Sequence, residues 1–317
     1  YFYKGDYDKA IKRFNQALEI AKRINNKKII NSLKNNIGVI HFNLANYDKA
    51  LEYWKPVLEG YKELNDSIGM ATLYANLGVI HYSRSNYVKA LEYYMKSSDI
   101  RQKIDDKEGI ASINSKIGLI YNEQEEYLKA IEHLSKSYNL YKELNDKRSM
   151  AKTLTNIGNN YKYLDSLQKA INHYHRSLKI SKEIDNRRLI AANLSNLGTE
   201  YLFYGKIDEA KKALQKALSI NRKLGRKDNM ANSLSNLGYF YYKTDDYKKA
   251  IDYYKQVIKT EDEIGAINES EQAYSMLSYC YANLGNYKQA WNYQNKHIEV
   301  KDSLFQKEKQ EKMEEKV

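Results

Sequence analysis

The sequence predicts an all-α protein: a solenoid of about eight helix hairpins, one every 40 residues, ending in a long C-terminal helix. Three observations support this prediction. An alanine recurs every 40 residues from Ala10 to Ala290, without an insertion. A glycine column with the same period runs from Gly38 to Gly238, and Ser278 takes the next position. The chain has one proline in 317 residues, which favours helices because proline disrupts their interior.

The residues around these columns indicate two packed helices in each repeat. An aliphatic residue precedes each glycine, and a histidine or tyrosine ring follows three residues later. Small residues in register let neighbouring helices approach closely, and the larger residues fill the space between hairpins. In the second helix of one repeat, Ala50, Trp54, Val57 and Leu58 follow the i, i+4, i+7 stripe of a half-buried helix.

Turn and capping residues predict the repeat boundaries at 1–25, 26–65, 66–105, 106–145, 146–185, 186–225, 226–265 and 266–305. At each junction stands a residue that tolerates the left-handed conformation: Asn25, Asn65, Asp105, Asn145, Asp185, Gly225 and Gly265. The next residue suits the N-cap of a first helix: Asn26, Asp66, Asp106, Asp146 and Asn186. Within the hairpins, the expected N-caps of the second helices are Asp6, Asn46, Asn86, Ser166, Asp246 and Asn286.

The motif in the third repeat reads Asn76-Leu77-Gly78, then His81, Tyr87 and Lys89-Ala90. It resembles the tetratricopeptide repeat, although the period is 40 residues and not about 34. The longer period is similar to a subgroup found in peptide-binding adaptors, peptide-sensing bacterial regulators and the sensing regions of bacterial histidine kinases. The resemblance implies a right-handed superhelix whose first helices line a concave groove that binds a protein or peptide.

The first and the last repeat both depart from the 40-residue pattern. Tyr1 already stands in the ring column, so we expect more repeat or a cap upstream. At the other end, Phe305 and Gln306 replace the helix-ending residues, which predicts one helix from about Tyr287 to near Val317. Residues 306–317 would form a helical extension: either a solvated capping helix or a connector, because the segment resembles the one leaving the array in sensor histidine kinases. In a full-length protein this helix would offer a dimerisation surface.

Charge and cysteine usage narrow the possible partners. The net charge of +12 comes from 52 basic and 40 acidic residues that are interspersed, which favours a solvated surface over an acidic partner, and we expect no nucleic acid. No stretch of 18 apolar residues occurs, so these residues predict no membrane span. The single cysteine, Cys280, excludes an internal disulfide and is expected to be buried and inert. The predicted compartment is the periplasm for a kinase sensor region, with the cytoplasm as the alternative.

Motifs for catalysis are absent from the sequence. It has no glycine-rich phosphate loop, no His-Glu-x-x-His pair and no Cys-x-x-Cys pair, so we expect no active site, cofactor or metal. His41 and His81 stand in the ring column and are predicted to pack in the core. Pro56 falls inside a second helix, where it removes the hydrogen bond to the carbonyl of Glu52 and should kink the helix.

One column of first-helix residues supplies the predicted ligand-binding side chains: Asn36, Asn76, Lys116, Asn156, Asn196 and Asn236. Side-chain amides carry both donors and acceptors, so such a ladder can pair with an extended peptide. The alternative is that each asparagine bonds to the neighbouring hairpin. Rings expected on the groove or its rim are Phe42, Tyr82, Tyr163, Phe203, Tyr239 and Tyr242. Lys116, Lys152 and Lys162 would favour an acidic or carboxylate-bearing ligand.

The predicted function is therefore non-catalytic protein or peptide binding by the sensing or scaffold region of a larger bacterial signalling protein, such as a histidine kinase. Any kinase module would lie outside these residues. The alternatives are a free-standing adaptor and a cytosolic regulator switched by a short peptide.

Overall fold

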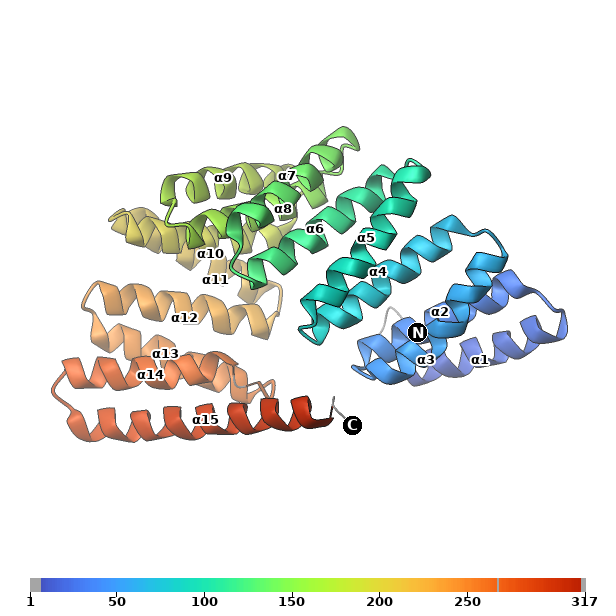
Figure 1. Ribbon diagram of the computed structural model, residues 1–317. Coiled ribbons are helices and arrows are strands. Elements are labelled where there is room, and N and C mark those ends of the chain that lie inside the picture. Colours follow the sequence, from blue (N-terminus) through green and yellow to red (C-terminus); the bar gives the residue numbers. More distant parts are fainter. Residues whose placement is uncertain (1–6, 267, 315–317) are drawn as a thin grey trace. The chain divides into compact units, whose positions relative to one another are not determined.

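The computed structural model describes residues 7–266 and 268–314, and this part of the chain holds fifteen helices and no strand (Figure 1). The helices are α1 (Tyr7–Arg23), α2 (Lys27–Asn43), α3 (Tyr47–Glu63), α4 (Ser67–Ser83), α5 (Tyr87–Lys103), α6 (Lys107–Glu123), α7 (Tyr127–Glu143), α8 (Lys147–Tyr163), α9 (Leu167–Glu183), α10 (Arg187–Phe203), α11 (Ile207–Lys223), α12 (Lys227–Lys243), α13 (Tyr247–Asp262), α14 (Asn268–Asn283) and α15 (Tyr287–Glu314). The predicted all-α class is thus confirmed.

Every described helix before α15 ends at a residue in the left-handed conformation. All seven predicted junction residues, from Asn25 to Gly265, have positive φ. The turn inside each hairpin uses the same conformation, which the sequence does not predict at Ala45 (φ 57°), Ser85 (φ 55°) or Glu125 (φ 60°). Helices therefore end every 20 residues, twice in each repeat.

Most of the predicted N-caps form. Each predicted first-helix cap accepts a backbone N–H three residues on, as in the 2.8 Å bond from Gly69 N to Asp66 Oδ1. Among second helices, Asn86, Asp246 and Asn286 cap in this way. The prediction is wrong for Asn46 and Ser166, whose side chains make no capping bond. Asp6 lies outside the described residues.

The chain divides into two compact units, unit 1 (Tyr1–Ser149) and unit 2 (Met150–Val317). In unit 1, α2–α3, α4–α5 and α6–α7 form hairpins, and α3 and α5 also contact the first helix of the following hairpin. Unit 2 repeats the arrangement with α10–α11, α12–α13 and α14–α15. We call the surface formed by the first, even-numbered helices within one unit its first-helix face. In unit 2, hydrogen bonds join successive first helices, as from Asn236 Nδ2 to Ser195 Oγ (2.9 Å).

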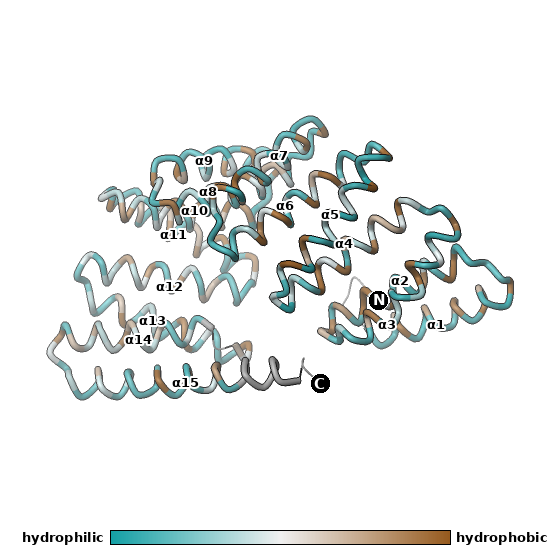
Figure 2. Tube along the Cα trace, in the orientation of Figure 1, coloured by the Kyte–Doolittle hydropathy of each residue, from teal (hydrophilic) through white to brown (hydrophobic). Residues whose placement is uncertain are grey.

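The glycine column marks where a large second-helix side chain lies against the first helix. A Cβ added at Gly38 would lie 2.1 Å from Trp54 Nε1, and one at Gly158 would lie 2.6 Å from Tyr174 Cε1. Equivalent side chains fill this position in both units and are almost fully buried: Trp54, Tyr94, Leu134, Tyr174, Leu214 and Tyr254. Figure 2 shows hydrophobic segments recurring along the helices between hydrophilic ones, as this packing requires.

Stacked rings join the two helices of most hairpins. His41 stacks on Tyr53 with ring centroids 5.5 Å apart, and His81 on Tyr93 at 5.3 Å. Both imidazoles are half-buried against these tyrosines, at the edge of the predicted core position, and burial lowers their pKa, which favours the neutral form. Cys280 is buried as predicted, and burial raises its thiol pKa to about 12.

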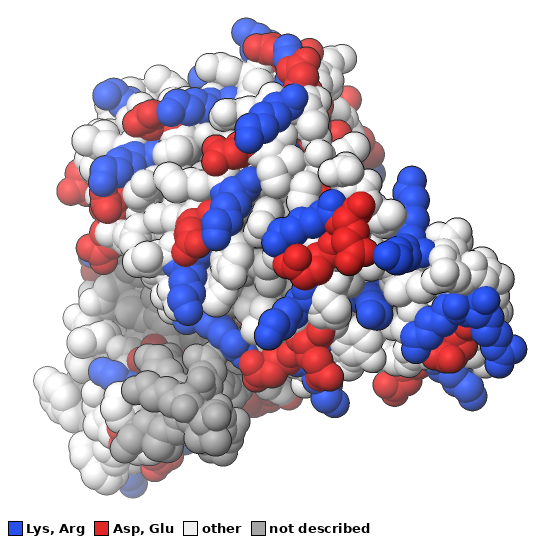
Figure 3. All heavy atoms as spheres, turned by 45° about the vertical axis from the view of Figure 1, so that its right-hand side comes forward, with Lys and Arg blue, Asp and Glu red and all other residues white. Residues whose placement is uncertain are grey.

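The predicted C-terminal helix is confirmed as far as Glu314, where α15 ends; residues 315–317 lie outside the described part. α3 runs on both sides of Pro56 without interruption, and the kink there stays a prediction. No helix in the described ranges is both long and apolar enough to cross a membrane. On the face drawn in Figure 3, basic and acidic side chains alternate.

Candidate functional site

The first-helix face of unit 1 is apolar in two adjacent columns of the repeat. One column holds Val39, Val79 and Leu119, which are half-buried, and the next residue in each repeat is a buried isoleucine. These isoleucines, Ile40, Ile80 and Ile120, are fully buried. At this repeat position the face therefore presents half-buried aliphatic side chains beside fully buried isoleucines.

The same two columns become polar at the start of unit 2. Asn159 and Asn160 replace the aliphatic pair in α8, and Thr199 and Glu200 replace it in α10. We call these four residues the polar inset. Asn160 and Glu200 are as buried as the isoleucines that they replace. Because burying a polar group without partners costs free energy, an inset in the core of a repeat is a candidate for function.

Glu200 is the most unusual member of the polar inset. Its side chain is 0% exposed, and neither carboxylate oxygen has a hydrogen-bond partner. The nearest cation is Lys162, whose Nζ lies 3.7 Å from Oε1 and thus beyond a normal hydrogen bond. Burial raises the pKa of the Glu200 carboxyl, and Lys162 offsets part of that shift.

Asn159 is the centre of a hydrogen-bond network beside Glu200. Its Oδ1 accepts from the Tyr174 hydroxyl at 2.8 Å and from Asn196 Nδ2 at 3.2 Å. The Asn160 amide donates to the backbone carbonyl of Asn156 at 2.9 Å. The network holds α8, α9 and α10 in register at this level of the face.

The predicted asparagine column divides by its contacts. Asn196 and Asn236 each donate a hydrogen bond to the neighbouring first helix. For these two residues the structure thus shows the alternative arrangement, in which the asparagine bonds to the neighbouring hairpin. The side chains of Asn36, Asn76 and Asn156 are half-buried on the face, and their amides make no hydrogen bond within the described chain. Lys116 Nζ donates to Ser112 Oγ at 3.3 Å. Ligand binding by this column stays a prediction.

The predicted rings lie at different depths. Tyr163 and Phe203 are the most open, at 58% and 53% exposed. Phe203 and Tyr239 are neighbours, with ring centroids 6.2 Å apart, whereas Tyr242 pairs with Tyr247 at the hairpin turn. The other two predicted rings, Phe42 and Tyr82, lie in unit 1, where they pair with Tyr47 and Tyr87. The Tyr82 hydroxyl donates to Glu123 at 3.4 Å, and burial raises its pKa to about 12. The two most exposed of the predicted rings thus lie in unit 2.

A hollow of about 140 Å³ opens on the first-helix face between α10 and α12, and we call it the amide hollow. Its buried floor includes Ser195, Asn221 and Ser233. The residues lining it are Arg188, Ala191, Ala192, Ser195, Asn196, Asn221, Asn229, Asn232 and Ser233. Four asparagines and one arginine converge here, so the hollow is polar and rich in hydrogen-bond donors.

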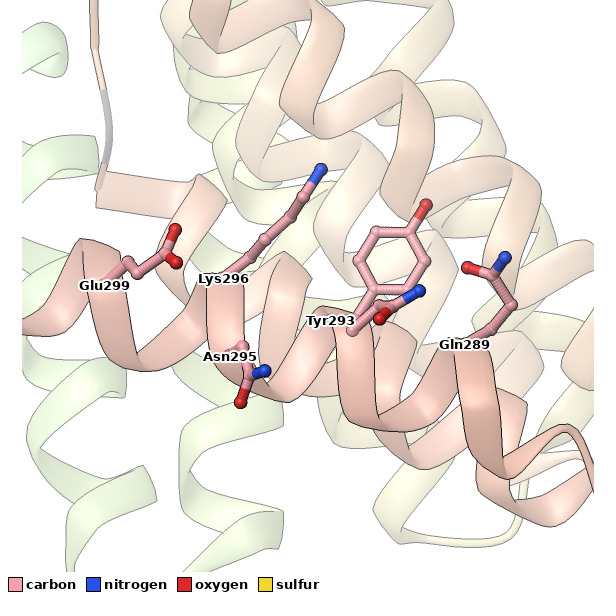
Figure 4. Close-up of a pocket in the computed structure, with 6 residues that line it drawn as sticks. Gln289, Tyr293, Asn295, Lys296 and Glu299 are labelled. Carbon is pink, nitrogen blue, oxygen red and sulfur yellow. The ribbon is translucent and has the colours of Figure 1, made fainter.

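A second depression, of about 320 Å³, lies along α15 (Figure 4). Gln289, Tyr293 and Lys296 point to the same side of the helix, and Asn295 points away. Every lining residue comes from α15, so no second element faces a ligand there. Among the described residues, no group of three or more His, Cys, Asp or Glu side chains is arranged to hold a metal ion.

Stacked helix hairpins with a polar, ring-bearing face define a solenoid of the kind that recognises other molecules. A tetratricopeptide repeat model matches residues 29–103, 109–183, 149–223 and 189–262, and a second one matches residues 1–23 and 271–303. The chain therefore belongs to the tetratricopeptide repeat family. No curated protein sequence matches it.

Solved structures with this fold include signalling proteins. Aspartyl phosphate phosphatase F from Bacillus subtilis is 17% identical with a TM-score of 0.69, over 90% of this chain and 74% of that one. A Signal Transduction ATPase with Numerous Domains from Pyrococcus horikoshii, which has a tetratricopeptide repeat sensor, is 18% identical with a TM-score of 0.73. That match covers 96% of this chain but 48% of the ATPase, so this chain spans about half of its length.

A third similar structure is a Rap protein complexed with Competence and Sporulation Factor. It is 16% identical with a TM-score of 0.56, over 94% of this chain and 99% of that one. At these identities the likeness shows the fold.

Two parts of the candidate site were missed by sequence reasoning. Glu200 was not singled out, because an acidic residue on a helix normally indicates a solvated position. Asn221 lies on a second helix, away from the predicted column. Aligning the repeats could have identified Glu200, because isoleucine recurs at its position in unit 1. The position of Asn221 varies from Ala21 to Tyr141, so the alignment gives no such signal there.

Proposed function

We propose that this chain binds a protein or peptide on the first-helix face of unit 2, without catalysis, as the sensing region of a signalling protein. The observation that carries the proposal is the change of this face from aliphatic to polar at α8–α10, beside open rings and the amide hollow. Buried amides that line a recess and rigid exposed rings are the usual elements of a specific binding surface.

The proposed sensing role has support from the family. The Pyrococcus ATPase carries a tetratricopeptide repeat sensor, and the Rap protein was solved in complex with Competence and Sporulation Factor. A regulatory array of the same fold would couple ligand binding on its face to an output module. We extend the proposal to a histidine kinase sensor region in the periplasm, which rests on the resemblance of the segment after Lys301.

A peptide-display screen against the purified chain tests the binding proposal. Selected peptides are then measured by calorimetry against the double variant Tyr163→Ala/Phe203→Ala. Both rings are more than half exposed, so their removal should leave the fold intact. We expect at least a 10-fold loss of affinity if they anchor the ligand, because such anchors typically contribute about 2 kcal/mol or more.

The matched control is Tyr287→Ala/Trp291→Ala on α15. These rings are exposed to a similar degree but lie on a second helix. We expect unchanged affinity. Equal losses in both double variants, or a screen that yields no binder, would argue against the first-helix face as the recognition surface.

A further inference from the structure

Two second helices of unit 2 hold a large share of the positive charge. α9 and α11 together carry nine basic and three acidic residues, and this surplus of six is half of the chain's net charge of +12. By contrast, α3, α5 and α7 of unit 1 together carry ten basic and eight acidic residues. Charges that are interspersed over the whole sequence are therefore unevenly distributed over the helices.

In unit 1 the exposed side of the second helices is balanced by ion pairs within each helix. Glu92 and Glu132 share one repeat position, and each pairs with the lysine four residues on, at 2.5 and 2.7 Å. Glu19 and Glu59 share a second position, and each pairs with the lysine three residues on, at 2.8 Å. Pairs at these spacings stabilise a helix slightly. The repeat thus neutralises these lysines internally.

The same two positions hold lysine in α11 and α9. Lys212 takes the place of the first glutamate, four residues before Lys216. Lys179 takes the place of the second glutamate, three residues before Lys182. All four side chains are exposed, and none forms an ion pair within the described part of the chain. Two ion pairs of the repeat have therefore become pairs of like charge.

The two lysine pairs belong to helices that pack together. α9 and α11 both contact α10, and their apolar sides share one buried cluster with it. Lys182 and Lys206, the residue before α11, are both near enough to His175 to lower its imidazole pKa, although burial has the larger effect. We call the surface formed by the two pairs the lysine patch: Lys179, Lys182, Lys212 and Lys216. The acidic residues of the two helices lie in their terminal turns: Glu183, Asp208 and Glu209.

The lysine patch carries a cost that the scaffold does not require. Like charges three or four residues apart destabilise a helix, and unit 1 shows that the repeat accepts glutamate at both positions. A partner that brings carboxylates to the patch removes this repulsion and forms the pairs that unit 1 forms internally. Lysine lacks the planar fork with which arginine binds phosphate, so the patch suits carboxylates better than a nucleic-acid backbone.

We infer that the lysine patch docks an acidic helical segment of a partner protein, which supplies the carboxylates that α9 and α11 lack. Glutamates one turn apart on such a segment match lysines one turn apart on α9 and α11. The patch lies on second helices, so this inference is independent of the binding proposed for the first-helix face.

The test uses a labelled helical peptide of repeated Glu-Ala-Ala-Ala, blocked at both ends, and its Gln-Ala-Ala-Ala counterpart. Fluorescence anisotropy measures the binding of each to the whole chain at low and at physiological salt. We expect the acidic peptide to bind and the glutamine peptide not to bind. The affinity should fall as salt rises, because salt screens exposed charges.

A double variant then locates the docking surface. Lys179→Glu/Lys212→Glu gives α9 and α11 the ion pairs of unit 1. The affinity for the acidic peptide should fall by about 10-fold or more, because attraction becomes like-charge repulsion. The unfolding temperature should not fall, since the like-charge pairs within each helix are removed. Circular dichroism measures it and checks the fold.

The matched control is Lys49→Glu/Lys89→Glu. It makes the same change in net charge in the first turns of α3 and α5, where an acid suits the helix N-terminus. We expect it to bind the acidic peptide as the wild type does. Equal losses in the two double variants, or equal binding of the two peptides, would overturn the inference, because the effect would then not depend on the lysine patch.

Two further measurements distinguish other occupants and other surfaces. Binding of duplex DNA or of phosphatidylglycerol vesicles, without binding of the acidic peptide, would contradict a protein partner. Tyr163→Ala/Phe203→Ala should bind the acidic peptide with unchanged affinity. A loss as large as that of Lys179→Glu/Lys212→Glu would place the peptide on the first-helix face, and the inference would be wrong.

Discussion

Units 1 and 2 share the same packing between the two helices of a hairpin, but they differ in side chains on the first-helix face and at the junctions between repeats. Both pack a large second-helix side chain against the first helix, and both end their helices with a left-handed residue. They differ on the first-helix face, where Ile80 and Ile120 of unit 1 correspond to Asn160 and Glu200 of unit 2. One junction differs as well, since Asn221 stands at the repeat position of the bulkier Tyr61, Arg101 and Tyr141 in unit 1.

The comparison separates positions that maintain the array from positions that adapt it. A repeat array gains stability from each hairpin and from each interface between neighbours, so most repeats can share the same core. A buried carboxylate without hydrogen bonds lowers stability, and its persistence in one repeat requires a compensating use. We therefore regard unit 1 as the more stable reference and unit 2 as the specialised part.

The largest predicted effect tests whether the scaffold is equivalent in the two units. Trp54→Ala in unit 1 and Tyr254→Ala in unit 2 each remove a ring that is 1% exposed. Each should lower the free energy of unfolding by about 3–5 kcal/mol, through lost burial and the cavity left behind. Urea unfolding followed by circular dichroism measures both, and changes in the m-value reveal loss of cooperativity.

Trp291→Ala is the control for these ring deletions. Its side chain is largely exposed, so we expect a change within about 0.5 kcal/mol. A loss confined to Trp54→Ala, with Tyr254→Ala near the control, would show that the two units do not share one packing scheme.

The next effect concerns the polar inset. Glu200→Ile gives unit 2 the side chain of unit 1, and we expect about 1–4 kcal/mol of added stability at pH 7, as when a buried ion pair is replaced by a well-packed apolar residue. Glu200→Gln separates charge from shape: it removes the charge but keeps a buried polar group, so its gain should be smaller. Thermal and urea unfolding of the three proteins provide the measurement.

The pH dependence of this stability has a definite sign. Burial raises the Glu200 carboxyl pKa above its ordinary value of 4.5, so the folded state holds its proton more tightly than the unfolded state. Between these two pKa values, stability falls as pH rises, and it levels off above the folded value. The gain from Glu200→Ile should therefore shrink towards pH 4. A gain that is constant from pH 4 to 8 would mean that the carboxyl is not protonated more readily in the folded state.

Much of this fold could be predicted from the sequence because the same helix-forming and helix-ending pattern recurs in every repeat. The alanine and glycine columns and the junction residues recur with one period, and each hairpin repeats the same evidence. The turns inside the hairpins were less visible. Alanine and glutamate do not favour positive φ, so the residue types at Ala45 and Glu125 do not indicate a turn. Their left-handed conformation follows from where the two flanking helices end.

The candidate site was less predictable, since it consists of exceptions. The asparagine column was predicted to bind ligand because it recurs in most repeats, yet Asn196 and Asn236 donate hydrogen bonds to neighbouring first helices. Glu200 and Asn221 occur once each, and their meaning depends on which side chains surround them in three dimensions. Periodicity predicts what the repeats have in common, and function uses the positions where they differ.

The smallest predicted effect tests the left-handed turns at one repeat position in both units. Ala45 in unit 1 has φ 57°, and Gly205 in unit 2 has φ 75° with open space around it. Ala45→Gly should stabilise the chain by up to about 1 kcal/mol, because relief of the left-handed strain exceeds the added entropy of the unfolded chain. Gly205→Ala should cost about 1 kcal/mol for the reverse reason. Ala282→Gly inside α14 is the control and should destabilise, since glycine is unfavourable within a helix. If Ala45→Gly also destabilises, the turns of unit 1 carry no strain, and the two units differ only on their faces and at their junctions.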